Sequence, residues 1–369
     1  MGLSVGIVGL PNVGKSTLFN ALTANNVLAA NYPFATIEPN IGVVQVPDDR
    51  LAQLAKLYNS QKIINSAVSF VDIAGIVRGA SKGEGLGNKF LAAIREVDVI
   101  CQVVRVFSSP DIIHVAGDIN PASDIETVNT ELILADLETV ETRLSKIARD
   151  VRTKPELAKV PEALEFLYSG LQTGTTAGQI LASAKGMELA KNEHVQKYFK
   201  ELHLLSDKQF IYVFNTDDND LGNTQLHEQL SELVKPYPRI FISAELEAEM
   251  TSLTDDEKLE LLAAFGQDQT GLSQLIKTAF AALGLQSFLT AGPKEVRSWT
   301  IKSGATAPEA AGAIHSDFQK GFIKAEIINY EDLMKYGSLP TARANGKARI
   351  EGKDYVMQDG DVVEFRFNV

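Results

Sequence analysis

The sequence contains a single cysteine, Cys101, so no disulfide can form within the chain and we expect it to fold without one. No run of about 18 uncharged apolar residues is present, and the first apolar run begins at residue 3, which leaves no room for a signal peptide. Positive charge is scarce, and a net charge of −12 argues against general affinity for nucleic acid or anionic membranes. We therefore expect a cytoplasmic protein without membrane association.

The clearest motif is G-x-x-x-x-G-K-S at residues 9–16, which follows the apolar run at residues 3–8 and precedes a helical stretch at residues 17–22. A strand before this loop and a helix after it are the setting of a P-loop. Backbone N–H groups, the helix N-terminus and Lys15 then supply positive potential for the β- and γ-phosphates of a nucleotide. Ser16 is placed to offer its hydroxyl to Mg²⁺.

A second motif, D-I-A-G at residues 72–75, ends the apolar run at residues 67–71. Asp72 at the end of a strand is suited to hold Mg²⁺ through a water molecule, and the N–H of Gly75 is suited to meet the γ-phosphate. Between the two motifs, Thr36 is placed to complete the Mg²⁺ coordination when a triphosphate is bound. Lys15, Thr36 and Gly75 are thus the candidate catalytic residues, and the combination is typical of a switch GTPase or a close relative.

Ile76 occupies the position after Gly75, where Ras-like proteins carry the glutamine that orients the attacking water. Isoleucine cannot align water by hydrogen bonding. We expect intrinsic hydrolysis on the order of 10⁻⁴ to 10⁻² s⁻¹, unless the substrate phosphate, a monovalent cation or a partner group supplies the missing stabilisation.

Recognition of the base is less clear in the sequence. In GTPases an Asn-Lys-x-Asp loop reads guanine, and here the predicted strand at residues 210–214 leads into N-T-D-D at residues 215–218. Asp218 stands at the position of the guanine-reading carboxylate, where a bidentate contact would favour guanine by about 1–3 kcal/mol. If the loop is displaced, Asn215 or the backbone of Thr216 meets the adenine amine instead. These residues alone leave both adenine and guanine open as the base that the loop binds.

Ser243 and Ala244 directly follow the predicted strand at residues 239–242. They resemble the start of the Ser-Ala-Lys loop that flanks the base in GTPases. The strand at residues 239–242 is the last of a series of β-rich runs that alternate with helical stretches, as expected for a nucleotide-binding α/β domain with a mostly parallel sheet. The predicted strands of this domain are residues 3–8, 41–46, 67–72, 98–106, 210–214 and 239–242.

A helical region interrupts this α/β pattern. Apolar residues with alternating spacings of four and three predict one long helix over residues 131–151, and helical segments resume at residues 163–171 and 179–205. The region is predicted to be an antiparallel coiled-coil arm, with an ordinary bundle packed on the sheet as the alternative. The apolar residues with heptad spacing are Ile133, Leu137, Val140, Leu144, Ile147 and Val151.

From about residue 285, short β-rich runs surround one predicted helix at residues 307–320, which indicates a small α+β domain. Trp299 lies in one of these runs, and we expect it to fill the core rather than to stack on a nucleic-acid base. Basic residues gather at residues 143–154 and 335–353, and either run is a candidate contact for RNA phosphates. The alternative for both runs is a solvated helix face or loop.

With these residues assembled, the whole chain resembles the Obg-like ATPase family of the YchF type. The matching runs are residues 9–16, 31–40, 72–88, 94–98, 291–301 and 304–312. The resemblance implies an Obg-related P-loop G domain interrupted by a helical coiled-coil domain and followed by a ubiquitin-like β-grasp (TGS) domain. The corresponding boundaries are residues 1–125 and 206–284 for the G domain, 126–205 for the insertion and 285–369 for the TGS domain.

The same resemblance implies Mg²⁺-dependent hydrolysis of ATP in preference to GTP, and association with the ribosome and its large subunit in translation or stress control. It assigns the metal to Ser16 and Thr36, and a contact on the adenine side to the backbone of Thr216. Family members usually end the base loop with glutamate, where this chain has Asp218. The implied phosphate contacts are Asn12, Val13, Gly14, Lys15, Ser16 and Thr17.

Our leading hypothesis is a monomeric nucleotide-dependent switch that hydrolyses ATP slowly and docks on ribosomal particles. The first alternative is a GTP-preferring enzyme of the same fold. A P-loop kinase for a small molecule is a further alternative, although the glycine-rich segment at residues 78–88 offers only Arg78 and Lys82 in place of an arginine-bearing lid. The last is a binding module in which the nucleotide is structural and its hydrolysis incidental.

Overall fold

The computed structural model describes residues 3–24, 41–73, 75, 86–108 and 119–368. These residues form two compact units. The first unit contains the described residues up to 42 and residues 70–272, and the second contains residues 43–69 and 273–368. None of the helices in these described ranges combines the length and apolar character needed to cross a bilayer.

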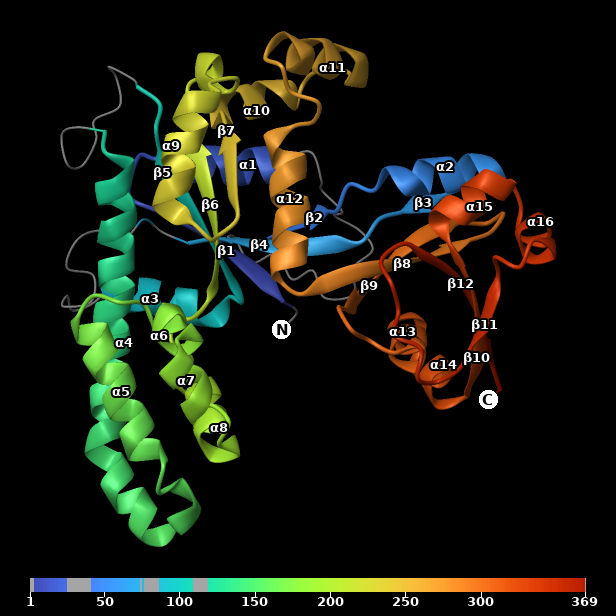
Figure 1. Ribbon diagram of the computed structural model, residues 1–369. Coiled ribbons are helices and arrows are strands. Elements are labelled where there is room, and N and C mark those ends of the chain that lie inside the picture. The colour runs from blue at the N-terminus through green and yellow to red at the C-terminus, as the bar shows by residue number, and fades with distance from the viewer. Residues whose placement is uncertain (1–2, 25–40, 74, 76–85, 109–118, 369) are drawn as a thin grey trace. The chain divides into compact units, whose positions relative to one another are not determined.

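The first sheet has six strands in the order β2-β4-β1-β5-β6-β7 (Figure 1). The pairs β1–β5, β5–β6 and β6–β7 are parallel. Parallel pairing brings the carboxyl ends of these strands to one edge, which is where ligands bind in open α/β sheets. The strands are β1 (Ser4–Val8), β2 (Ile41–Gln45), β4 (Ala67–Asp72), β5 (Val99–Arg105), β6 (Gln209–Asn215) and β7 (Arg239–Ile242).

Each of these strands lies within two residues of its predicted bounds. β5 is buried along its whole length, and the thiol of Cys101 lies inside it with no exposed surface, as expected for a central strand of a parallel sheet that is covered on both faces. The helices that accompany the sheet are α1 (Lys15–Ala24), α3 (Leu86–Glu96), α9 (Thr224–Val234), α10 (Ala244–Met250), α11 (Asp255–Ala264) and α12 (Gly271–Ala282), with a 3₁₀ turn at Asp218–Asp220.

The helical insertion begins with α4 (Pro121–Thr153), a helix of 33 residues that starts ten residues before its predicted start. Pro121 stands in its first turn, and the side chain of Asn120 accepts a hydrogen bond from the N–H of Ser123, so both helix-start signals are present. The first half of α4 packs on β5. Its second half extends beyond the sheet alongside α5 (Val160–Gln172) (Figure 1).

The predicted heptad face is the buried face of this insertion. Ile133, Val140 and Ile147 are buried among residues of α5 and of α8 (Glu193–Leu202), and the intervening positions Leu137 and Leu144 are partly buried against the same cluster. Both sequence-based alternatives therefore hold in part, because α4 packs on the sheet with one end and on its helical neighbours with the other.

The predicted helical region at residues 179–205 is helical in the structure but divided. Three short helices occupy this region: α6 (Ala177–Ala182), α7 (Ala184–Leu189) and α8. Ser183 ends α6 in extended conformation and caps α7 by accepting from the N–H of Gly186, and Asn192 caps α8 through the N–H groups of His194 and Val195. Such side chains compete with the helical hydrogen-bond ladder, which explains the breaks.

A buried carboxylate joins the insertion to the sheet. Asp136 on α4 accepts hydrogen bonds at 2.8 Å from the N–H groups of Leu205 and Ser206 and at 2.7 Å from the Ser206 hydroxyl. Burial raises the pKa of Asp136, and these three donors oppose the shift. Nearby, the ammonium of Lys208 donates to the carbonyls of Arg95 and Val97 at the end of α3. The returning chain is thereby fixed to both α4 and α3.

The second unit has its own sheet, in the order β11-β10-β12-β8-β9-β3. β8–β9, β10–β12 and β10–β11 pair antiparallel, whereas β12–β8 and β3–β9 pair in parallel. The strands are β3 (Ile63–Ile64), β8 (Leu285–Ala291), β9 (Val296–Lys302), β10 (Phe322–Asn329), β11 (Arg349–Glu351) and β12 (Asp361–Phe367). The helices are α2 (Asp49–Tyr58), α13 (Ala307–Ile314), α14 (Ser316–Lys320), α15 (Tyr330–Tyr336) and α16 (Leu339–Ala344).

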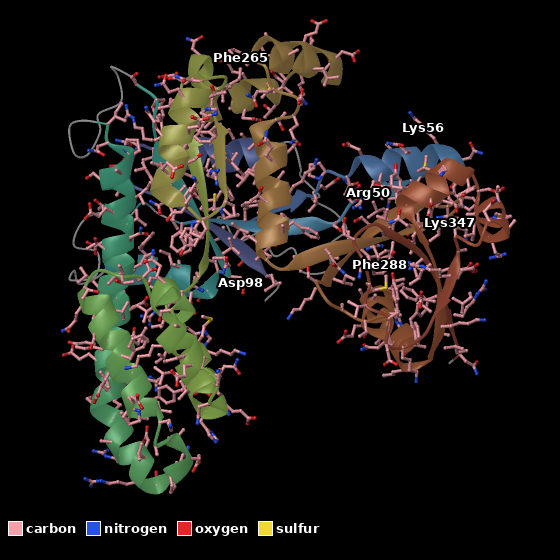
Figure 2. All side chains as sticks on the ribbon, in the orientation of Figure 1. Arg50, Lys56, Asp98, Phe265, Phe288 and Lys347 are labelled. Carbon is pink, nitrogen blue, oxygen red and sulfur yellow. The ribbon has the colours of Figure 1, made fainter. Side chains whose placement is uncertain are left out.

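Successive side chains of these strands point to opposite faces and build two cores. Phe288 lies on the α13 face, in the interior of the unit (Figure 2), and Trp299 stacks on it while donating its indole N–H to the hydroxyl of Thr290 at 2.9 Å. Leu289 faces the other way, toward α2, α15 and α16. Trp299 is thus a partly buried core residue of this unit, as its sequence context predicted.

The predicted single helix over residues 307–320 was wrong, because it is divided at His315. That residue has extended backbone, with φ −161°, and its ring nitrogen accepts from the N–H of Asp317 at 3.2 Å, so it caps α14. The packing of α2 on this unit had no signal in the sequence. Leu51 and Leu54 of α2 are buried in its second core, and Arg50 (Figure 2) donates to the Asp359 carboxylate at 2.8 Å.

Replacing Asp136 by alanine should lower the free energy of unfolding by about 3 kcal/mol, because the two buried N–H groups of Leu205 and Ser206 would lose their acceptor. Chemical denaturation of the full chain measures the effect. The matched control is Glu138→Ala on the exposed side of the same helix, for which we expect a change within about 0.5 kcal/mol. Equal effects of the two substitutions would contradict the structural role given to Asp136.

Candidate functional site

The loop between β1 and α1 has the backbone that a phosphate cradle requires. Gly9, Asn12 and Gly14 have φ values of 154°, 63° and 94°, a region that residues other than glycine seldom occupy. A Cβ on Gly9 would lie 2.5 Å from the carbonyl oxygen of Val103, and one on Gly14 would overlap the amide nitrogen of Asn215. Both glycines are therefore needed for backbone conformation and for close packing.

Lys15 lies at the first position of α1 and is buried, with 8% of its surface exposed. Its ammonium donates to the carbonyl oxygen of Leu10 at 2.6 Å and so folds back over the loop. Burial lowers the pKa of Lys15 to about 8, while the nearby carboxylate of Asp72 acts in the opposite direction. A desolvated cation at a helix N-terminus is a strong attractant for an anionic ligand.

Asp72, the last residue of β4, and Gly75, three residues later, both lie near Lys15. Burial raises the pKa of Asp72, and the charge of Lys15 opposes that shift. A Cβ on Gly75 would stand 3.1 Å from the Lys15 ammonium and 3.3 Å from the backbone nitrogen of Pro11, so the Gly75 backbone borders the cradle directly. The side chain of Ser16 is exposed on the first turn of α1.

This donor set fits Mg²⁺, which prefers hard oxygen ligands and keeps part of its water shell. Ser16 offers a hydroxyl oxygen on the first turn of α1 and Asp72 a carboxylate near Lys15, and the ammonium of Lys15 and the helix N-terminus would also meet phosphate oxygens. Thr36, one of the three predicted catalytic residues, and Ile76, the residue after Gly75, lie outside the described residues.

Asn215, at the end of β6, connects the phosphate and base regions. Its amide nitrogen donates to the carbonyl of Val13 at 3.0 Å, and its amide oxygen accepts from the N–H of Ala244 at 2.9 Å. Only 5% of its surface is exposed. The amide is thus engaged by protein on both sides, which disfavours the alternative in which Asn215 itself meets the adenine amine.

The remaining base-loop residues have distinct environments. The N–H of Thr216 donates to the carbonyl of Ile242, and its buried hydroxyl has no hydrogen-bond partner among the described residues. The carboxylate of Asp217 accepts from the N–H of Ser108 at 3.0 Å. Asp218 begins the 3₁₀ turn and is partly exposed. Of the two acids, Asp217 is held by protein contacts.

Sequence reasoning missed the segment after β5 that borders this loop. The N–H of Phe107 donates to the carbonyl of Asn215 at 3.0 Å, and the guanidinium of Arg105 lies over the Phe107 ring at 4.4 Å. Ser108 follows and meets Asp217. A signal was present in the sequence, since Arg105 follows a run that is apolar except for Gln102, and a charged residue in such a strand requires a specific reason.

The second base-side loop begins α10. Ser243 caps this helix by accepting from the N–H of Leu246 at 3.2 Å, and Ala244 is the partner of Asn215. One turn later, the buried carboxylate of Glu247 accepts from the N–H groups of Gly271 and Leu272 at 2.5 and 3.3 Å, at the N-terminus of α12. The loop next to the base site is thereby connected to the start of α12.

Comparison with known proteins agrees with this geometry. Residues 4–142 match a family described as a 50S ribosome-binding GTPase, and residues 285–368 match the C-terminal family of YchF GTPases, described as a protein of unknown function. Over 375 residues the chain is 48% identical to a Bacillus subtilis protein named ribosome-binding ATPase YchF, with all of both chains covered. The chain belongs to the YchF family.

Other members agree with this assignment. A YchF protein of Escherichia coli O157:H7, also named a ribosome-binding ATPase, is 46% identical over 376 residues with both chains fully covered. The solved YchF GTPase of Schizosaccharomyces pombe superposes with a TM-score of 0.82 at 36% identity, covering 99% of this chain and 97% of that one. These findings confirm the predicted family, the predicted P-loop fold class and the prediction of a nucleotide hydrolase.

In this YchF chain, Asn215→Ala should weaken nucleotide binding by at least about tenfold, because it removes the link that holds the P-loop against the Ala244 loop. Asn215→Asp should have a similar effect, since it would set an oxygen against the Val13 carbonyl. Equilibrium titration with a fluorescent nucleotide analogue measures both. Asn345→Ala, at an exposed site in the second unit, is the control, and wild-type affinity in the Asn215 variants would contradict the link.

Glu247 gives the YchF chain a pH-dependent stability. Burial raises its pKa to about 7, although the two amides of α12 oppose the shift. The folded state thus holds this proton more tightly than the unfolded state, and the contribution of Glu247 to stability falls as pH rises from about 4.5 to 7. Glu247→Gln keeps an acceptor oxygen and removes the charge.

We therefore expect Glu247→Gln to gain stability relative to wild type as pH rises from about 4.5 to 8, by up to about 3 kcal/mol. Chemical denaturation at a series of pH values measures this difference. Glu249→Gln, on the exposed side of the same helix, should show no such trend. A difference between Glu247→Gln and wild type that stays constant with pH would show that Glu247 is not a buried, perturbed carboxyl group.

Proposed function

We propose that this chain is a slow, Mg²⁺-dependent ATPase that acts as a nucleotide-controlled switch on the ribosome and its large subunit, in translation or stress regulation. The observation that carries the proposal is the convergence of the buried ammonium of Lys15, the carboxylate of Asp72 and the backbone of Gly75 on one P-loop. Full-length relatives that carry the name ribosome-binding ATPase support the choice of substrate and partner.

In this proposal, the backbone of residues 12–17 and the ammonium of Lys15 bind the phosphate groups. Ser16 and Thr36 hold Mg²⁺ directly, and Asp72 holds it through water. When bound, Mg²⁺ neutralises charge that develops on the phosphate oxygens. Gly75 contributes its N–H to the γ-phosphate. With Ile76 after it, the chain lacks a water-orienting glutamine, so the intrinsic rate is low unless a monovalent cation or a partner assists.

The base rests against the loops that Asn215 connects. Asn215 positions the Ala244 loop, and Ser243 caps the helix that follows it. Thr216 supplies a backbone carbonyl to the adenine amine in the ATP-preferring form of this proposal. GTP remains the second candidate for one specific reason, which is that Asp218 stands free of the contact with Ser108 that holds its neighbour Asp217.

The basic residues of α4 are the better candidate for contact with RNA. Within residues 143–154 the basic side chains Arg143, Lys146 and Arg149 are exposed on the arm. In residues 335–353, by contrast, acidic groups from other elements reduce the charge: Arg343 pairs with Glu326, and Lys347 approaches Asp332 at 3.5 Å. We further infer a monomer that works in the cytoplasm, with the domain boundaries inferred from the sequence and a TGS domain at its C-terminus.

Calorimetric titration with MgATP and MgGTP tests the substrate assignment. We expect ATP to bind more tightly, and GTP binding at least tenfold tighter than ATP would overturn the ATP assignment in favour of the Asp218 contact with guanine. Incubation with ATP and cellular metabolites should yield ADP and inorganic phosphate. A phosphorylated small molecule formed in stoichiometric amounts would instead support the kinase alternative.

Lys15→Ala tests the switch itself. Removing the ammonium should abolish tight nucleotide binding. It should also remove the effect of ATP on co-sedimentation with ribosomes, because the protein would stay nucleotide-free whether or not ATP is present. The control is Lys89→Ala at an exposed position on α3. Co-sedimentation of the Lys15→Ala variant that equals wild type with and without ATP would favour the passive binding module.

A further inference from the structure

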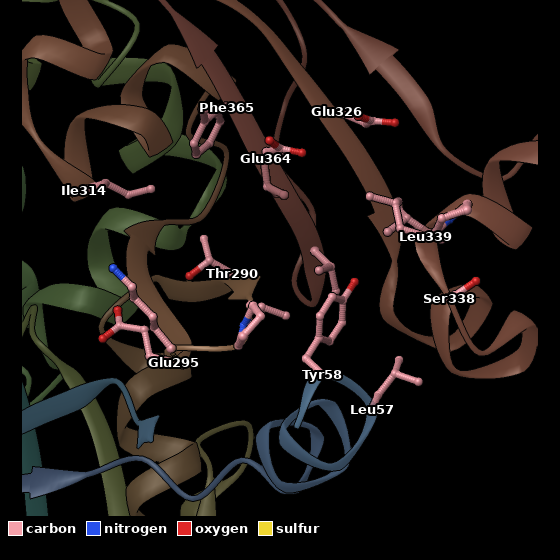
Figure 3. A pocket seen from close by; sticks show the side chains of 18 of the residues that line it. Leu57, Tyr58, Thr290, Glu295, Ile314, Glu326, Ser338, Leu339, Glu364 and Phe365 are labelled. Carbon is pink, nitrogen blue, oxygen red and sulfur yellow. The ribbon is translucent and has the colours of Figure 1, made fainter. Parts of the chain in front are cut away.

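The second unit contains a groove of about 960 Å³ beside β12 (Figure 3). The acidic residues that β10 and β12 place in its lining are paired with basic residues, since Arg343 pairs with Glu326 and Arg366 with Glu364. Charge at this groove therefore favours no particular ligand. In the first unit, by contrast, several contacts converge on the turn that follows the base loop.

The base loop, residues 215–218, runs directly into the 3₁₀ turn Asp218–Asp220, so Asp218 belongs to both. The backbone of the turn closes on itself, because the N–H of Leu221 donates to the carbonyl of Asp218 at 3.2 Å. A contact that fixes the end of the turn therefore also restrains the backbone of Asp218 at its start.

His227 on α9 makes such a contact. Its Nε2 lies 3.0 Å from the carbonyl oxygen of Asp220. A carbonyl oxygen only accepts hydrogen bonds, so Nε2 carries a proton and donates it. Burial lowers the pKa of His227, and the hydrogen bond to the Asp220 carbonyl and the charge of Asp220 oppose the shift. The ring is thus neutral at pH 7, and its single N–H is used to hold the turn.

The same ring is linked to the strand that leads into the base loop. It stacks on Phe241 of β7, with the ring centroids 3.7 Å apart and the ring planes 9° from parallel. Phe241 in turn stacks on Phe214 of β6 at 5.3 Å, and Phe214 directly precedes Asn215. His227 is therefore linked to both ends of the base loop, to Asn215 through two aromatic rings and to Asp218 through the turn.

Two further side chains hold the end of the turn. The amide of Gln267 donates to the carbonyl of Leu221 at 2.9 Å, and the amide of Asn223 donates to the carboxylate of Asp220 at 2.9 Å. Both contacts are to the turn, whereas the His227 ring also contacts β7. We therefore expect the turn to keep its shape without the His227 hydrogen bond, while its position relative to β6 becomes less restricted.

We propose that His227 is a positioning residue for the nucleobase: by fixing the turn relative to β6, it sets the spacing between Asn215 and Asp218 across which the base binds. This inference rests on the proposed nucleotide function and concerns a residue that acts through the base loop. A loop that is already correctly spaced needs no ordering when the base binds. Loss of the His227 contact thus weakens nucleotide binding and leaves the chemistry at the phosphates unchanged.

Three full-length variants test this role. His227→Phe keeps a ring that can stack on Phe241 and removes the N–H. His227→Gln supplies an amide N–H for the Asp220 carbonyl and removes the ring. Gln229→Ala, at an exposed position on the same helix, is the control. Calorimetric titration with MgATP and MgGTP gives the Kd values, and steady-state hydrolysis gives KM and kcat separately.

For the nucleotide that the wild type prefers, we expect His227→Phe to raise Kd and KM about fivefold, as the loss of one hydrogen bond would, and to change kcat less than about twofold. His227→Gln should restore both constants to within about twofold of wild type, and Gln229→Ala should match wild type. A merely structural role would instead lower kcat, because fewer molecules would be folded, and leave KM unchanged.

NMR gives a second readout that does not depend on hydrolysis. Long-range ¹H–¹⁵N spectra of the free protein at pH 7 should show the His227 proton on Nε2, with the signals assigned by comparison with His227→Gln. A proton on Nδ1 instead would overturn the proposal, since Nε2 could then not donate to the Asp220 carbonyl.

Two binding results would also overturn it. The first is nucleotide binding by His227→Phe that is as tight as in the wild type. The second is a His227→Gln variant as weak as His227→Phe, because the hydrogen bond would then not set the loop. Both results require a wild type that binds nucleotide, so they leave the proposed switch function standing. A wild-type chain that binds no purine nucleotide would contradict the proposed function and this inference together.

Discussion

The buried ammonium of Lys15 is the interaction on which the nucleotide site depends. Holding this cation at 8% exposure lowers its pKa from 10.5 to about 8. That net shift corresponds to about 3 kcal/mol, which remains although the carboxylate of Asp72 already offsets part of the desolvation. Contact with an anion can relieve it. A triphosphate with Mg²⁺ supplies the negative charge that this arrangement lacks.

From that point, hydrogen bonds connect the cradle to distant parts of the first unit. Asn215 ties Val13 of the P-loop to Ala244 at the start of α10. Glu247, one turn further, holds the first residues of α12, the helix that continues into the second unit. Elsewhere in the first unit, the ammonium of Lys208 donates to the carbonyl of Val97 and fixes the end of α3, the helix that follows Gly75 in the chain. A change at the phosphates therefore has a short route to α12 through Asn215 and the helix that carries Glu247.

The sequence predicted the features that are local in the chain. The P-loop, the strand that ends at Asp72 and the heptad face of α4 each depend on residues within about twenty positions of one another, so spacing alone reveals them. Contacts between distant residues were not predictable in the same way. The amide of Asn215 is engaged across 202 positions, and α2 packs on strands more than 200 residues later. Local capping by His315 divided the helix predicted at residues 307–320, and capping by Ser183 divided the helical region predicted at residues 179–205, because a side-chain cap outweighed helix periodicity.

The account as a whole rests on Lys15 being a desolvated cation that a nucleotide stabilises, and NMR of the lysine side-chain ammonium measures this most directly. The full chain would be titrated with pH in the absence of nucleotide and again with saturating MgATP, with Lys15→Arg to assign the signal. We predict a pKa of about 8 for Lys15 in the free protein and a rise to at least its ordinary value of 10.5 in the complex. A pKa already near 10.5 without nucleotide, or one that MgATP leaves unchanged, would contradict the account.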